Sequence, residues 1–187
     1  MLAQRLEAGP ASRTALGLMA AGLTLKTALF PFHFWLPPAH ASAPAPVSAL
    51  LSALVIKASF YILVRLWLEL FAPLAGADNA AGEVLGLLGM AAILWGSWQA
   101  LRQPRVKLLV AYSTVAQVGY LFLAFPLFSA TGLPDPAAWR AVLWLTLAHA
   151  LAKAAMFLAA GNLQRFGGHD RIADLDCVAQ RLPDRKS

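Results

Sequence analysis

Residues 25–38 read LKTALFPFHFWLPP, and residues 55–61 read VIKASFY. Each stretch places a lysine, Lys26 or Lys57, inside an apolar run, and a proline-rich segment separates the two runs. An ammonium group within a membrane span costs about 2.5–3.5 kcal/mol on insertion scales. A single substitution to leucine would remove that cost. We therefore infer that the charges are used, and the usual use inside a membrane is the movement of protons or ions.

The composition is that of a multi-pass membrane protein. Hydrophobic residues make up 59% of the 187 positions and charged residues 13%, and the mean hydropathy is +0.63. The net charge of +6 gathers at the ends of apolar runs, and no basic stretch is interleaved with aromatic residues, so we expect no nucleic-acid partner. The single cysteine, Cys177, excludes an internal disulfide and an iron–sulfur site.

Five apolar segments are long enough to cross about 30 Å of hydrocarbon. They should be helices, because lipid offers backbone polar groups no other partner. We predict an all-α, polytopic membrane helix bundle of about five transmembrane helices within residues 1–165, followed by a polar cytoplasmic tail or loop at 166–187. The predicted spans are Thr14–Phe34, Val47–Phe71, Glu83–Leu101, Val106–Phe128 and Ala137–Leu163.

The lysines and arginines between these spans indicate the orientation. The basic side should face the cytoplasm, which places the N-terminus outside and the chain in the cell inner (plasma) membrane. An outward N-terminus without a signal peptide also fits a piece of a longer protein. The residues on the basic side are Arg102, Arg105, Lys107, Arg165, Arg171, Arg181, Arg185 and Lys186.

The first predicted span contains Pro31, five residues after Lys26. Proline lacks the backbone donor and opposes the carbonyl four residues earlier, so a helix break is predicted here. Transporters place such breaks at ion sites. Alternatively, Pro31 ends the helix at the interface, with Phe34 and Trp35 in the aromatic belt. The residues alone leave both interpretations open.

Three lysines, Lys26, Lys57 and Lys153, lie near the middles of the first, second and fifth predicted spans. The alternative is that their long stems reach the interface, which fits Lys57 least because apolar residues flank it widely. His149 precedes Lys153 by four residues, so both should lie on one helix face. A neutral histidine bonded to a facing helix is the alternative. No second histidine or carboxylate lies at ligand spacing within a span, so no metal is expected.

The carboxylates all fall in loops, tails or span ends, so none lies at mid-membrane depth beside the lysines. Buried charges normally need partners. Either the lysines are neutral for part of the time, or their partners lie on helices outside this chain. Both alternatives are compatible with proton transfer, because a desolvated lysine can take up and release a proton.

Several segments closely resemble the proton-antiporter-like membrane subunits of respiratory complex I, Mrp-type sodium/proton antiporters and membrane-bound hydrogenases. Their order along the chain is the order of that family's motifs, and together they cover nearly the whole chain. The segments are KTALFPFHFWLPPAH (26–40), APVSALL (45–51), KASFYILVR (57–65), VKLLVAYSTVAQVGY (106–120) and HALAKAAMFLAAG (149–161).

The resemblance implies part of an inverted-repeat fold in which buried lysines relay protons along a polar axis. By motif, Lys26 matches the lysine of the broken helix and Lys57 matches the connecting lysine. His149 and Lys153 match the pair that links into the second half. Members of the family have about fourteen spans, so the resemblance implies that this chain is a fragment. Some members carry a second histidine where this chain has Leu145.

The function implied is that of a proton-translocating antiporter-like subunit of an NADH:quinone oxidoreductase-type complex. Its partners would be lipid, protons and the other membrane subunits. We expect no cofactor in this chain, and any redox chemistry would belong to partner subunits. One alternative is an Mrp-type antiporter subunit that moves sodium ions. A non-conducting structural membrane subunit is another.

Overall fold

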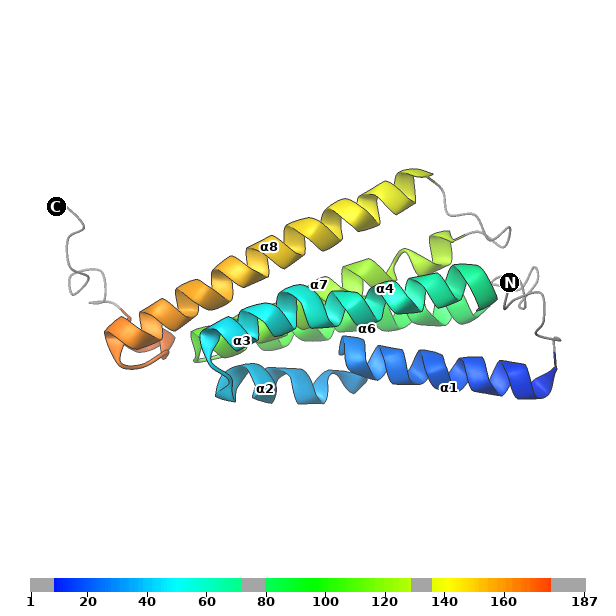
Figure 1. The fold of residues 1–187 in the computed structure, drawn as a ribbon. Helices are drawn as coiled ribbons and strands as arrows, with labels where there is room; N and C mark the ends of the chain where they lie inside the picture. The colour runs from blue at the N-terminus through cyan, green and yellow to red at the C-terminus, as the bar shows by residue number, and fades with distance from the viewer. Residues whose placement is uncertain (1–8, 72–79, 129–135, 176–187) are drawn as a thin grey trace.

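The computed structural model describes residues 9–71, 80–128 and 136–175, and they form a bundle of helices, which confirms the all-α prediction (Figure 1). Two short segments, η2 and η3, are π-helical, while η1, η4 and η5 are 3-10 turns. In chain order the elements are α1 (Pro10–Thr27), η1 (Phe32–Trp35), α2 (Leu36–Ser42), α3 (Ala45–Leu50), η2 (Leu51–Val55), α4 (Ile56–Leu66), η3 (Trp67–Phe71), α6 (Ala80–Leu101), α7 (Val106–Phe122), η4 (Phe125–Leu127), α8 (Pro136–Gly167) and η5 (Ile172–Asp174).

Four stretches of helix in the described residues are long and apolar enough to cross a membrane, namely Ala45–Phe71, Ala80–Leu101, Val106–Leu127 and Pro136–Gly167. A fifth span is formed if α1 and the helical segment Phe32–Ser42, which are bent by 41°, are taken together. Helix α7 contacts α2, α6 and α8, while α1 packs on α4 (Figure 1). Helix α7 is therefore central, and the prediction of about five spans is confirmed.

The first span is broken where Pro31 predicts it, but its boundaries differ from Thr14–Phe34. Helix α1 ends at Thr27, the residue whose carbonyl Pro31 would oppose, and Ala28 adopts a left-handed conformation with φ of 60°. The chain then resumes as η1 and α2 and continues to Ser42. The indole of Trp35 donates to the Leu25 carbonyl at 2.8 Å, so a side chain satisfies a carbonyl at the end of α1.

Helices α6 and α7 approach each other closely through glycine. A Cβ atom added to Gly119 would lie 2.4 Å from the Gly89 carbonyl oxygen, and one added to Gly96 would lie 2.6 Å from the Ala116 amide nitrogen. Small residues allow this approach, which is a common source of packing energy between membrane helices. Helix α7 is thus fixed against α6 along its length.

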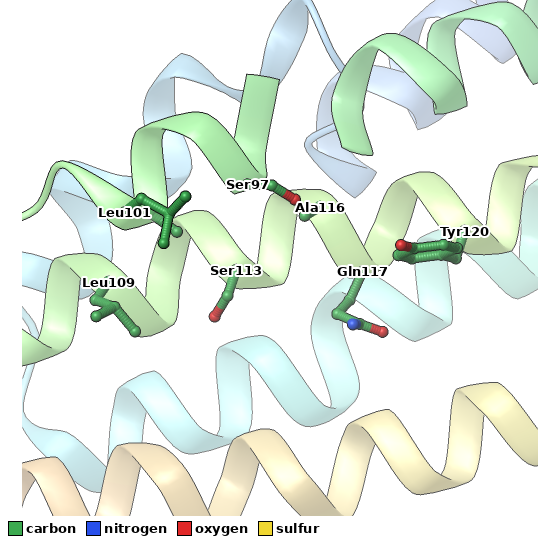
Figure 2. Close-up of a pocket in the computed structure, with 8 residues that line it drawn as sticks. Ser97, Leu101, Leu109, Ser113, Ala116, Gln117 and Tyr120 are labelled. Carbon is green, nitrogen blue, oxygen red and sulfur yellow. The ribbon is translucent and has the colours of Figure 1, made fainter. Parts of the chain in front are cut away.

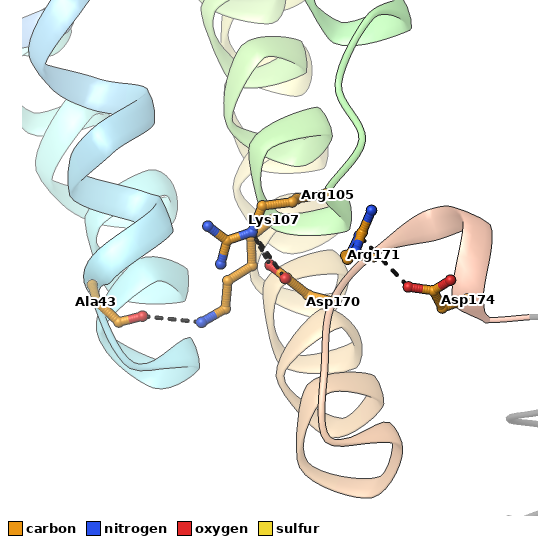
Figure 3. A network of polar contacts seen from close by, with 6 residues as sticks. All are labelled: Ala43, Arg105, Lys107, Asp170, Arg171 and Asp174. Carbon is orange, nitrogen blue, oxygen red and sulfur yellow. Dashed lines mark hydrogen bonds and ion pairs between the residues drawn. The ribbon is translucent and has the colours of Figure 1, made fainter.

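A clasp of residues 104–106 and 170–172 joins the start of α7 to the segment after α8 (Figure 3). The Val106 amide donates to the Asp170 carbonyl, and the Ile172 amide donates to the Pro104 carbonyl, both at 2.9 Å. The Arg105 guanidinium donates to the Asp170 carboxylate at 2.9 Å. Part of the predicted tail is therefore packed on the bundle, and residues 176–187 lie outside the described residues.

The glycine contact predicts that Gly119→Leu will destabilise the protein. The new side chain must displace the Gly89 backbone, and overpacking of this kind costs about 1–3 kcal/mol. Thermal unfolding in detergent should show a lower midpoint for this variant. The matched control is Gly22→Leu on α1, because nothing lies within 4 Å of a Cβ added there. Equal midpoints for the two variants would contradict the packing argument.

The clasp predicts that Asp170→Asn will loosen the end of α8. The Asp170 side chain is 6% exposed and is charge-paired with Arg105, so losing the charge should cost about 1–3 kcal/mol. Hydrogen exchange at the Val106 and Ile172 amides should become faster. Asp174→Asn is the control, since its pair with Arg171 is largely exposed and such pairs contribute about 0–1 kcal/mol. Equal exchange in both variants would show that the Arg105 pair is not what holds the clasp.

Candidate functional site

Lys57 is buried on α4, directly after the π-helical segment η2. The Ile56 amide donates to the Leu51 carbonyl, five residues back, instead of to Ser52. The Lys57 ammonium donates to the Ser52 carbonyl. Single π-helical turns inside α-helices are frequent at functional sites, and here the turn places a carbonyl against a buried charge.

Lys153 is buried on α8 and faces α7. Its ammonium donates to the Ser113 hydroxyl and, at 3.4 Å, to the Val110 carbonyl. The same carbonyl accepts the hydroxyls of Ser113 and Thr114, each at 2.9 Å. One backbone oxygen of α7 therefore organises the three polar side chains that meet there.

The residues that hold the two lysines meet at a pair of hydroxyl groups, because Ser52 accepts from Lys57 through its carbonyl and Thr114 shares the Val110 carbonyl with Lys153. The Ser52 and Thr114 hydroxyls lie 3.3 Å apart, within hydrogen-bond distance. We call Ser52, Lys57, Ser113, Thr114 and Lys153 the polar seam. Among the described residues, neither lysine of the seam forms an ion pair, so dipoles of carbonyl and hydroxyl groups are what stabilise their charge.

His149 lies on the same face of α8 as Lys153, which confirms the spacing argument. Within the described part of the chain, neither nitrogen of its buried ring has a hydrogen-bond partner, so the alternative of a histidine bonded to a facing helix is not observed. The ring lines a groove of about 450 Å³ between α7 and α8, together with Ser113, Gln117 and Lys153. Both Lys57 and Lys153 lie within electrostatic range of the ring.

A second groove, of about 330 Å³, lies on the α6 side of α7. It shares Leu109, Ser113 and Gln117 with the first groove, and these side chains project from α7 at intervals of one helical turn (Figure 2). Ser113 thus belongs to both grooves and to the polar seam. Its hydroxyl can donate and accept, as a group that passes protons must.

Lys26 does not join the other three predicted residues. It is exposed in the last turn of α1, while its neighbours Thr24 and Thr27 are buried. The Thr27 hydroxyl donates to the Ser59 hydroxyl at 3.1 Å, so the inner face of α1 contacts α4 through hydroxyl groups. The structure therefore gathers Lys57, His149 and Lys153 in one place and leaves Lys26 on the outer face.

Three buried basic residues were not among the predicted site residues, namely His33, His40 and Lys107. His40 is fully buried, although it follows Pro37 and Pro38 in the proline-rich segment between the first two predicted spans. Lys107, which we assigned to the cytoplasmic surface, is 5% exposed and donates to the Ala43 carbonyl at 3.1 Å (Figure 3). The burial of Lys107 could have been inferred from its position within the apolar helical sequence VKLLVAY.

No three histidine, cysteine or carboxylate side chains of the described residues come together as metal ligands would.

Comparison with known proteins agrees with this architecture. Residues 2–183 match the family model described as NADH:quinone oxidoreductase/Mrp antiporter, transmembrane. The chain is 38% identical over 169 residues to NADH-quinone oxidoreductase subunit N of Desulforudis audaxviator, covering 90% of this chain and 32% of that one. It is 39% identical over 175 residues to a probable K(+)/H(+) antiporter subunit of Rhizobium meliloti, covering 93% of this chain and 16% of that one.

Among solved structures, a chain of the Mrp complex from Dietzia sp. superimposes with a TM-score of 0.75 at 28% identity, covering 85% of this chain and 28% of that one. The chain therefore spans about a third or less of the length of these relatives. The match to the family model covers nearly every residue, including the polar seam. This chain belongs to the NADH:quinone oxidoreductase/Mrp antiporter transmembrane family.

Proposed function

We propose that this chain is a proton-conducting part of an antiporter-like membrane subunit and that Lys57, His149 and Lys153 relay the proton. The observation that carries the proposal is the polar seam. Two buried lysines on different helices lie at the ends of one network of backbone carbonyl and hydroxyl groups, and no carboxylate of the described residues neutralises them. A purely structural bundle gains nothing from two such charges, because their desolvation is unfavourable.

The seam suits the relay chemically. Repulsion between two ammonium groups in a weakly polar interior favours a state in which only one of them carries the extra proton. The hydroxyls of Ser52, Thr114 and Ser113 both donate and accept, so they can order a proton path between the lysines. His149 can accept the proton at one ring nitrogen and release another proton from the second nitrogen.

Lys26 takes a different place in this proposal. It ends the helix that breaks before Pro31, and its exposed side chain leaves the described bundle. Broken helices in transporters place backbone dipoles at ion sites. We assign Lys26 to the entry of the relay, where a carboxylate of another helix would pair with it.

The relatives support membership of a larger assembly. One is named a subunit of an NADH-quinone oxidoreductase, and a solved neighbour belongs to an Mrp complex. By analogy, this chain would pack against other membrane subunits in the plasma membrane, and redox chemistry would take place in its partners. The exposed apolar residues of α8, such as Trp144 and Leu151, provide surface for lipid or for those partners.

A potassium- or sodium-coupled antiporter is the second candidate. The observation that favours it is the similarity to the probable K(+)/H(+) antiporter protein, whose identity is as high as that of the oxidoreductase protein. Transport assays with and without each cation would separate the candidates. Proton uptake that requires sodium or potassium on the opposite side indicates the antiporter, and uptake that requires only electron donor and quinone indicates the oxidoreductase.

The relay predicts that Lys57→Leu and Lys153→Leu will each lower proton translocation at least about tenfold, because each removes a proton carrier. The measurement is the initial rate of proton uptake by vesicles that contain the complete complex. Lys57→Arg should also be impaired, because a guanidinium does not release its proton. The structural-subunit alternative instead predicts normal uptake in the leucine variants.

The control for this experiment is Arg140→Leu, which removes an exposed cation whose guanidinium donates to the Pro136 carbonyl at 3.1 Å. Its uptake should equal that of the unchanged complex. Assembly of every variant is checked by native gel electrophoresis. Assembled leucine variants with normal uptake would reject the proposed relay.

A further inference from the structure

His40 on α2 is a buried imidazole with no function in the relay described above. His40 as a whole residue is 0% exposed, and among the described residues neither nitrogen of its ring has a hydrogen-bond partner. Nearly all buried polar atoms in folded proteins are paired, and an unpaired one is unfavourable. A buried ring with both nitrogens unpaired therefore calls for an explanation.

The ring is held by packing rather than by hydrogen bonds. It stacks on Phe157 of α8, with centroids 4.3 Å apart and planes inclined by 22°. The backbone is fixed separately, since the Ser48 hydroxyl donates to the His40 carbonyl at 3.3 Å. Stacking against one face of the imidazole fixes the plane of the ring. The two nitrogens lie at the ring edge, which the stacking leaves uncovered, and an imidazole exchanges protons through these nitrogens.

The charged groups within electrostatic range of the ring include three lysines, one from each of three helices. Lys57 of α4, Lys107 of α7 and Lys153 of α8 all lie within electrostatic range of it. No carboxylate acts on it among the described residues. Among the described residues, the charged groups that act on His40 are therefore all basic, and the apolar ring of Phe157 covers one face of the imidazole.

These lysines follow one another along the bundle axis. Phe157 lies one turn beyond Lys153 on α8, about 6 Å nearer to the clasp. Lys107 lies in the first turn of α7, beside Arg105 of the clasp, and its ammonium reaches the Ala43 carbonyl just after α2 (Figure 3). His40 therefore occupies the level between Lys107 at the clasp and the polar seam.

We propose that His40 is a further relay residue, which passes protons between Lys107 at the clasp end and the Lys57–Lys153 pair. This inference rests on the proposed function. In one transfer, the neutral imidazole takes a proton from the Lys107 ammonium at one nitrogen and releases its other proton to a neutral lysine of the seam. Lys107 then regains a proton from the aqueous phase, so proton number is conserved at each step.

The test uses His40→Gln in the complete complex, because glutamine retains polarity but does not relay protons at neutral pH. We expect proton uptake to fall at least about tenfold while assembly is unchanged. The matched control is His169→Gln, the same replacement at a histidine next to the clasp, which should leave uptake unchanged. Imidazole added to assembled His40→Gly should restore part of the flux, an effect that a packing role would not produce.

Lys107→Gln provides a second, independent readout if the His40 variants fail to assemble. The proposal requires the same loss of uptake from this variant, because it removes the donor to His40. Normal uptake in assembled His40→Gln or Lys107→Gln, together with impaired uptake in Lys57→Leu, would overturn the role of His40 but not the proposed function. Normal uptake in Lys57→Leu as well would instead overturn the proposed function.

Discussion

The backbone contact between α6 and α7 at Gly89 and Gly119 holds the central helix of this bundle in place. The hydrophobic effect does not drive helices together within lipid, so close packing of small residues supplies the association energy. Because α7 is fixed in this way, Val110, Ser113 and Thr114 face η2 and α8 at defined positions. The geometry of the polar seam depends on that contact.

Stabilising a positive charge without a carboxylate is the second constraint. The Lys57 ammonium uses a carbonyl that a π-helical turn makes available, and the Lys153 ammonium uses a hydroxyl and a carbonyl of α7. Dipoles stabilise an ammonium less firmly than a carboxylate does. A lysine held in this way can lose its proton more readily than one in a salt bridge, which is the property that a relay requires.

The helix break at Pro31 shows how local chemistry and tertiary packing combine. Proline requires α1 to end, and the indole of Trp35 then satisfies a carbonyl at that end. The break also turns the chain so that α2 contacts α7, which brings His40 within electrostatic range of Lys57, Lys107 and Lys153.

The sequence by itself determined the helical class, the approximate spans and the interruption of the first helix near Pro31, because hydropathy and the missing proline donor act locally. It left open whether the chain continues as a broken span or leaves the membrane there. It also placed His149 and Lys153 on one face, since a spacing of four residues fixes that relation within a helix. Its motifs and their order agree with the family found by comparison.

Only the tertiary structure decided which basic residues meet. It placed Lys26 outside the cluster, and it buried His40 and Lys107, which looked like residues of a loop and of the cytoplasmic surface. Burial of a side chain depends on the rotation of each helix about its axis and on the helix that packs against it. Those are set by contacts between residues far apart in the chain, such as Ser52 with Thr114 and His40 with Phe157.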